Sequence, residues 1–235
     1  MTTGLVAIVT GAAGAIGREL AAGYARDGLH VHLVDASESV VELAAALGGT
    51  AHVLDATDPD AVRRLQEIPR VDVLVNGIGV WPLVPVDELS PEKWNRFMDI
   101  NLNSAYSVTW SCIGGLRTAS GAVVNIASAL ALKGHEQMVH YAAAKAGMIG
   151  MTRSLARALG ADNVRVNAVA PGLVATERAV ESWGDDGAAA FRATRALPID
   201  ITTSDVVEAV RFLGSQSARA ITGQTLVVDG GTVMH

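Results

Sequence analysis

Residues 5–17 read LVAIVTGAAGAIG, and the fold prediction starts from this stretch. The first five residues form a continuous aliphatic run, which is typical of a β-strand buried on both faces. Glycines follow at positions 11, 14 and 17, and residues 18–27 have the pattern of a helix that ends at Gly28. A strand, a glycine-rich turn and a helix together aim backbone N–H groups at an anion, usually a phosphate. The stretch therefore predicts the phosphate-binding corner of a nucleotide site.

The next strand, residues 30–34, ends at an acidic residue, Asp35. A carboxylate at this point can accept hydrogen bonds from a ribose 2′-OH, and it would repel a 2′-phosphate. No basic residue stands at position 14 or 36, so the electrostatics favour NAD over NADP. The alternative interpretation is a glycine turn followed by a surface aspartate, but the strand–helix–strand context favours the nucleotide site.

Strands and helices alternate along the whole chain. Further strands are expected at 51–54, 71–75, 122–127, 164–170 and 225–228, with helices at 39–47, 59–67, 91–117, 137–160 and 203–213. This alternation predicts a single doubly wound α/β domain of the Rossmann type over residues 1–235, with a seven-stranded parallel sheet flanked by helices on both faces. Residues 175–200 have a mixed composition, and we expect them to form a lid over the substrate.

The bulk composition limits the classes of protein. The chain has 235 residues, half of them apolar, and a formal net charge of -6, which argues against nucleic acid or an anionic membrane as the main partner. A single cysteine, Cys112, allows no internal disulfide, and a reducing compartment fits. The first strand begins almost at once, without room for a signal peptide, and no apolar run is long enough to span a bilayer. We therefore expect a cytoplasmic protein.

Residues 128–145, SALALKGHEQMVHYAAAK, contain candidate catalytic groups. Tyr141 and Lys145 lie four residues apart on an expected helix, so the ammonium can sit beside the phenol. An opposite charge within reach favours ionisation of a phenol by roughly one to three pKa units. Ser128 follows the preceding strand, where a loop can bring its hydroxyl to the same point. The three groups predict a proton-transfer site beyond the carboxyl ends of the strands, where parallel sheets bind ligands.

Taken together, these motifs resemble the short-chain dehydrogenase/reductase family over essentially the whole chain. The matching residues are TGAAGAIG at 10–17, Asp35, Asp55, NGIG at 76–79, Asn101, Ser128, YAAAK at 141–145, PGLVAT at 171–176 and GQTLVVDGG at 223–231. The ending is similar to that of bacterial members that oxidise small secondary or aromatic alcohols. The resemblance implies an NAD-dependent oxidoreductase that transfers a hydride between nicotinamide C4 and a small secondary alcohol or ketone.

The resemblance also implies a role for each catalytic residue. Tyr141 would be the acid/base, and Lys145 would hold the nicotinamide ribose and lower the pKa of the phenol. Ser128 would bind the substrate oxygen, and Asn101 would anchor a water molecule in a proton relay. His135, in the loop between Ser128 and Tyr141, is a further candidate for contact with the substrate.

Contacts to NAD follow from the same matching. They are expected from Gly11, Gly14, Ile16 and Gly17 at the pyrophosphate, Asp35 at the adenosine ribose, Asp55 and Ala56 at the adenine, Asn76, Gly77 and Ile78 along the next segment, and Pro171, Gly172, Val174 and Thr176 at the nicotinamide, beside Tyr141 and Lys145. Two positions depart from the family pattern. Ala15 replaces a glycine, and its methyl group could crowd the pyrophosphate; Gly77 replaces an asparagine. By analogy with the family, we expect a homotetramer or homodimer.

Two other functions remain open at this stage. One is an NADPH-dependent carbonyl or 3-oxoacyl reductase of the same family, and the other is an NAD(H)-binding regulator without turnover. Trp81, Met138 and Trp183 are candidates for the pocket wall, with core packing as the alternative, and His140 is expected to be structural. No metal is expected, because the six histidines show no metal-ligand spacing with carboxylates or with Cys112.

Overall fold

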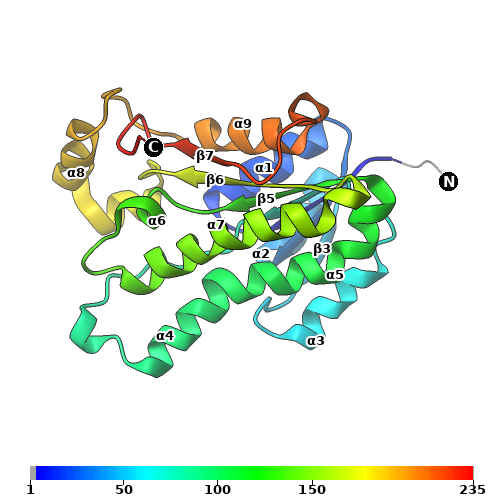
Figure 1. Cartoon of the computed structure of the whole chain (residues 1–235), viewed down its shortest axis with the longest axis horizontal. Coiled ribbons are helices and arrows are strands. Elements are labelled where there is room, and N and C mark those ends of the chain that lie inside the picture. Colours follow the sequence, from blue (N-terminus) through cyan, green and yellow to red (C-terminus); the bar gives the residue numbers. More distant parts are fainter. Residues whose placement is uncertain (1–3, 235) are drawn as a thin grey trace.

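The computed structural model describes residues 4–234, without the side chains of seven residues of helix α8 (178, 180, 182, 183, 185, 186 and 188). Its centre is one sheet in the order β3-β2-β1-β4-β5-β6-β7 with parallel pairing throughout, so the predicted seven-stranded parallel sheet is confirmed (Figure 1). The strands are β1 (Val6–Thr10), β2 (His30–Asp35), β3 (Thr50–Val53), β4 (Val73–Asn76), β5 (Ala122–Ile126), β6 (Arg165–Pro171) and β7 (Thr225–Val228).

Helices cover both faces of this sheet. They are α1 (Ala15–Arg26), α2 (Ser39–Leu47), α3 (Pro59–Val62), α4 (Pro91–Met98), α5 (Ser104–Ala119), α6 (Leu130–Lys133), α7 (Val139–Leu159), α8 (Glu177–Ala193) and α9 (Thr203–Gly214). Figure 1 shows α1 and α9 on one side of the sheet and α5 and α7 on the other. No helix in the described part of the chain combines the length and the apolar character that a membrane crossing requires.

The apolar core has one layer on each face of the sheet. Leu20 of α1 and Val206 of α9 are fully buried on one face, and Leu65 and Leu116 are fully buried on the other. Full burial of a side chain of this size contributes about 1.5–3 kcal/mol. Because both faces are covered, the strands carry continuous aliphatic runs rather than an alternating pattern, which is why they could be predicted from the sequence.

A chain of buried polar side chains crosses the core between β4 and β5. Asn76 Nδ2 donates to Thr109 Oγ1 (2.9 Å) and to Asn125 Oδ1 (2.8 Å), and Asn125 Nδ2 donates to Thr152 Oγ1 (2.8 Å). All four residues are 0–1 % exposed. Buried polar groups need such partners, so the network fixes the register of α5 and α7 against the two central strands.

The segment predicted as one long helix at 91–117 is two helices joined by a π-helical turn. Ser90 caps α4, with its Oγ accepting the Lys93 N–H (3.4 Å), and Pro91 occupies the first helical position. The turn Asp99–Asn103 separates α4 from α5. Single π turns inside helices are frequent at functional sites, and this one contains Asn101.

Two loops around the carboxyl ends of the strands contain helices of their own. The segment 129–138 includes the short helix α6, and most of the predicted lid at 175–200 is helix α8. The backbone of α8 leaves helical geometry at Gly184, where φ is 63°. The role of this segment as a lid stays a prediction.

Candidate active site

One cavity of about 1500 Å³ opens at the carboxyl ends of the strands. Its wall contains the predicted residues Gly11, Gly14, Ile16, Gly17, Asp35, Asp55, Ala56, Gly77, Ile78, Ser128, His135, Tyr141, Lys145, Pro171, Gly172, Val174 and Thr176. The wall also contains Asp229 and Thr232, so the segments that follow all seven strands meet around one space, as expected for ligand binding in a doubly wound sheet. Asn76 and Asn101 do not belong to the wall and are described below.

The glycine turn after β1 has room only for backbone. Gly11 has a φ of 68°, and a Cβ added there would lie 2.7 Å from the carbonyl oxygen of Gly77. A Cβ at Gly17 would lie 2.2 Å from the oxygen of Gly11. Gly14 precedes the first residue of α1, so the N–H groups of the helix start face the cavity beside Ala15. A turn whose glycines carry no side chains, placed at a helix N-terminus, leaves room for the pyrophosphate of a dinucleotide and offers it N–H groups.

Two carboxylates are held at the ends of β2 and β3. Asp35 accepts the Ala13 N–H at Oδ2 and the Ser37 N–H at Oδ1, each at 3.0 Å, and this locks it against the glycine turn. Asp55 Oδ1 accepts the N–H (2.9 Å) and the hydroxyl (2.8 Å) of Thr57. The position of Asp35 fits the ribose of a nicotinamide dinucleotide, and both carboxylates line the same cavity.

The structure adds a cation near Asp35 that the sequence pattern did not identify. Arg18 Nε donates to the carbonyl of Ala13 (2.8 Å), and its Nη2 donates to Ser39 Oγ (3.2 Å). Ser39 Oγ also hydrogen-bonds to Ser37 Oγ (2.9 Å). Because Arg18 lies one turn along α1 from Gly14, positions 14 and 36 alone understate the positive charge at this end of the cavity.

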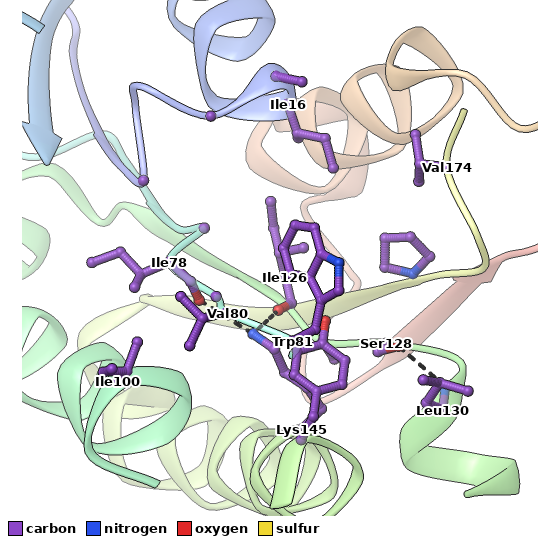
Figure 2. Close-up of a pocket in the computed structure, with 18 of the residues that line it drawn as sticks. Ile16, Ile78, Val80, Trp81, Ile100, Ile126, Ser128, Leu130, Lys145 and Val174 are labelled. Atoms are coloured by element: carbon purple, nitrogen blue, oxygen red, sulfur yellow. Dashed lines mark hydrogen bonds between the residues drawn. The ribbon is translucent and has the colours of Figure 1, made fainter. Parts of the chain in front are cut away.

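Lys145 is held under the site by backbone carbonyls. Its ammonium, on a residue only 2 % exposed, donates to the oxygen of Ile126 (2.8 Å) and of Ile78 (3.3 Å), as Figure 2 shows. The Nζ atom is 5.7 Å from the centre of the Tyr141 ring. Burial lowers the pKa of Lys145 to about 7, so the side chain can gain or lose a proton near neutral pH.

The pKa of the Tyr141 phenol is governed mainly by burial. Burial raises the pKa of Tyr141 to about 12, and hydrogen bonding with Ser128 acts in the opposite, lowering direction. From the sequence, Lys145 was expected to lower this pKa. The ammonium instead points at the carbonyls of Ile78 and Ile126, and its own charge is weakened by burial. Desolvation therefore outweighs the hydrogen bond with Ser128, and the lowering of this pKa by Lys145 stays a prediction.

Asn101 and Asn76 support the wall from behind. Asn101 is fully buried; its Oδ1 accepts the Val80 N–H (2.9 Å), and its Nδ2 donates to the carbonyl of Phe97 (3.0 Å). It thus ties the loop after β4 to the π turn. The sequence prediction placed Asn76 among the cofactor contacts, but its amide donates to Thr109 and Asn125 in the core. The side chain of Asn76 therefore stabilises the strand rather than lining the cavity.

The cavity has an aromatic and aliphatic wall next to Tyr141. Trp81 makes an edge contact with Tyr141, with 6.4 Å between ring centres, and the buried Met138 lines the same cavity. Figure 2 shows the indole of Trp81 in the middle of the pocket residues, with Ile126 and Lys145 among its neighbours in the view. His135 lines the cavity, and its Nδ1 accepts the Gln137 N–H (3.2 Å). The side chain of Trp183 lies outside the described residues.

His140 does not take part in the cavity wall. Its ring is fully buried and makes an edge contact with Phe97, with 4.1 Å between ring centres. Burial lowers the pKa of His140, so the ring is neutral at physiological pH. The residue next to Tyr141 in the sequence therefore packs α7 against α4, in agreement with the expected structural role.

Comparisons with known proteins identify the class to which this fold and site belong. A family model described as enoyl-(acyl carrier protein) reductase matches residues 11–233. A D-threitol dehydrogenase of Mycolicibacterium smegmatis is 36 % identical, covering 97 % of this chain and 92 % of the relative. A 3-oxoacyl-[acyl-carrier-protein] reductase of Thermotoga maritima is 32 % identical, covering 98 % of each chain.

A solved structure agrees with these relatives. A crystal structure from Beutenbergia cavernae, provisionally assigned as an NAD(P)-dependent gluconate 5-dehydrogenase and holding NADP at low occupancy, is 37 % identical with a TM-score of 0.90, covering 98 % of this chain and 97 % of the other. The chain belongs to the short-chain dehydrogenase/reductase family. It is an oxidoreductase of that family with a site for a nicotinamide cofactor.

A substitution at Gly17 tests the glycine turn. Gly17→Ala would place a Cβ against the backbone oxygen of Gly11, so helix α1 must shift away from the turn. We expect NADH affinity, measured by quenching of tryptophan fluorescence, to fall at least about tenfold. Gly150→Ala is the control, because a Cβ there meets nothing within 4 Å. Equal NADH affinity in both variants would contradict the assignment of the turn.

Proposed function

We propose that this chain is an NAD(H)-dependent oxidoreductase that interconverts small secondary alcohols and ketones. The observation that carries the proposal is the shared cavity: Tyr141, Ser128 and Lys145 open onto the same space as the glycine turn and Asp35. A proton-transfer group beside a dinucleotide site is the arrangement that hydride transfer to or from an alcohol carbon requires.

The side chains of the site handle the substrate oxygen and its proton. When bound, the nicotinamide ring supplies or accepts the hydride. In alcohol oxidation, the Tyr141 oxygen takes the hydroxyl proton; in ketone reduction, the phenol returns a proton to the same oxygen. The Ser128 hydroxyl hydrogen-bonds to that oxygen and stabilises its developing charge. Trp81 and Met138 exclude water from one side of the reacting atoms.

Lys145 and Asn101 are proposed to take part in proton transfer to and from the Tyr141 phenol. A pKa near 7 allows Lys145 to hold or release a proton at neutral pH, and the carbonyls of Ile78 and Ile126 keep it beneath Tyr141. The oxygen of Asn101 accepts one hydrogen bond, from Val80, so a second lone pair remains for a water molecule. We propose that this oxygen anchors the water of the expected proton relay.

The proposed substrate class rests on the residues of the cavity wall and on the similarity to known dehydrogenases. Trp81, Leu130 and Met138 narrow the space beside Tyr141, while Lys133 and His135 add polar groups to the same cavity. This combination favours small substrates with more than one oxygen, and the similarity to a D-threitol dehydrogenase supports a small polyol. His135 is proposed as a contact to a second oxygen of the substrate.

The competing activity within the family is NADPH-dependent reduction of a carbonyl or 3-oxoacyl substrate. The similarity to a 3-oxoacyl reductase and the nearby guanidinium of Arg18 favour it, whereas the Asp35 carboxylate opposes a 2′-phosphate. A regulator that binds the cofactor without turnover has no need of the complete set of Ser128, Tyr141 and Lys145. The charge at Asp35 and the reactivity of Tyr141 therefore decide between these functions.

The assembly remains a proposal as well. Tyr106 and Trp110 on α5 are 53 % and 47 % exposed, and such aromatic groups are enriched at protein interfaces. They support the expected homotetramer or homodimer built through α5 and α7.

Cofactor choice is tested by titration with NADH and NADPH. We expect NADH to bind at least about tenfold more tightly, because Asp35 repels the 2′-phosphate. Asp35→Asn keeps the size of the side chain and removes the charge, so the ratio of the two affinities should shrink. Asp87→Asn, an exposed acid outside the cavity, should leave the ratio unchanged. Tighter binding of NADPH to the wild type would favour the reductase alternative.

Catalysis by the phenol is tested with Tyr141→Phe. Removal of the acid/base should lower kcat by about 10²–10⁴, the usual contribution of such a group, while NADH binding stays within about twofold. The assay follows reduced-nicotinamide absorbance with small polyols and the matching ketones. Tyr24→Phe is the matched control: it removes a core hydroxyl, outside the cavity wall, that makes no hydrogen bond within the described part of the chain, and should retain full turnover. Unchanged turnover in Tyr141→Phe would refute the mechanism.

The pH dependence follows from the raised pKa of Tyr141. Alcohol oxidation needs the phenolate, whose fraction increases as the pH approaches about 12, so kcat/KM for oxidation should rise across roughly pH 7–10. Ketone reduction uses the protonated phenol and should show no such rise. In Ser128→Ala, a hydrogen bond that lowers the pKa is lost, so the rise should move to higher pH. Oxidation that is independent of pH over this range would exclude the phenol as the base.

A further inference from the structure

Arg195 is a buried cation that lies outside the motifs quoted in the sequence analysis. It follows helix α8 by two residues and is 9 % exposed, with its side chain at the cavity wall. Its Nη2 donates to the carbonyl of Leu173 (2.8 Å), and its Nη1 donates to the carbonyl of Ile199. A long charged side chain is rarely buried, so this placement calls for an explanation.

The guanidinium of Arg195 is hydrogen-bonded to two segments at one end of the cavity, and its aliphatic part lies beside a third. Leu173 belongs to the loop after β6, and Ile199 belongs to the return from α8 to α9. The third segment is the C-terminal turn, where a Cβ at Gly230 would lie 3.0 Å from the Arg195 side chain. The same turn accepts the Leu197 N–H at the oxygen of Gly230 (2.8 Å). The three segments thus pack against the side chain of Arg195.

The charge of Arg195 is matched mainly by carbonyl oxygens. Asp200 Oδ1 is 4.0 Å away, whereas Asp200 Oδ2 makes a shorter contact, 2.7 Å, with Arg192. A buried charge is tolerated only when its donors are hydrogen-bonded. The planar guanidinium meets two carbonyls from different segments at once, which a lysine ammonium cannot reproduce with the same geometry. The position of the Leu173 carbonyl therefore depends on an arginine at this point.

Leu173 lies between Gly172 and Val174, two residues that line the cavity and are expected to contact the nicotinamide. We infer that Arg195 is a positioning residue that holds the loop 171–176 in its cofactor-binding conformation. This inference rests on the proposed function, because the loop acts on catalysis only through a bound nicotinamide. Arg195 acts through the Leu173 carbonyl and leaves the proton chemistry of Tyr141 unchanged.

Arg165 provides a matched control for the chemistry of Arg195. Its guanidinium also donates to backbone carbonyls, those of Leu213 (2.7 Å), Gly214 (3.3 Å) and Ser215 (2.9 Å). However, it stands at the first residue of β6, at the opposite end of the strand from the cavity. Replacing each arginine in turn therefore distinguishes a general loss of stability from a loss of cofactor positioning.

The experiment compares Arg195→Met, Arg195→Lys and Arg165→Met in the full chain. We expect Arg195→Met to raise the NADH Kd and the KM for NAD about tenfold, while kcat changes less than about threefold. Arg195→Lys should lie between Arg195→Met and the wild type, because one carbonyl stays within reach of its ammonium. Arg165→Met should lower the melting temperature and leave the NADH Kd within about twofold of the wild type.

Each outcome decides the inference. A folded Arg195→Met with wild-type NADH Kd and KM would overturn it, and so would an equal loss of NADH affinity in Arg165→Met. If Arg195→Met gives no cooperative melting transition, Arg195→Lys decides by the same criteria. A wild type that binds NADPH but not NADH would contradict only the NAD proposal, and the comparison would then be made with NADPH. A wild type that binds neither nucleotide would refute both proposals.

Discussion

The buried ammonium of Lys145 sets the geometry on which the rest of the site depends. A cation with 2 % exposure must find acceptors within the protein, and it finds them in the carbonyls of Ile78 and Ile126. These carbonyls belong to the segments that end β4 and β5, so one side chain of α7 joins two adjacent strands at their carboxyl ends. Tyr141 lies one helical turn earlier on α7 and is positioned by the same contacts.

The parallel sheet explains why residues far apart in the sequence meet at this ammonium. Every strand ends at the same edge, and the loops that follow must pass close to one another. The glycine turn and the loop after β4 approach each other closely: a Cβ at Gly11 would lie 2.7 Å from the Gly77 oxygen. A Cβ at Gly79 would lie 3.6 Å from Lys145 Nζ and 3.4 Å from Asn101 Oδ1. Small residues therefore let the dinucleotide turn and the proton-transfer groups share one cavity.

The sequence predicts the features that depend on local pattern. Aliphatic runs and helical periodicity extend over only a few residues. The sequence therefore predicts the buried strands, the glycine turn and the spacing of Tyr141 and Lys145. The inward side chain of Asn76, the π turn at Asn101 and the three-segment contact of Arg195 depend on neighbours that folding supplies. The pKa of Tyr141 belongs to this second group: spacing indicates a nearby ammonium, but only the structure shows where that ammonium points.

Burial moves the two ionisable groups of the site towards their neutral forms. It raises the pKa of Tyr141 to about 12 and lowers that of Lys145 to about 7. At neutral pH the phenol is therefore protonated, which is the form that donates to a ketone oxygen, and the lysine is near the midpoint of its titration. Alcohol oxidation in the proposed reaction would use the phenolate, so the raised pKa of Tyr141 acts against it at neutral pH. The two pKa shifts thus have one physical cause, the removal of water from around Tyr141 and Lys145.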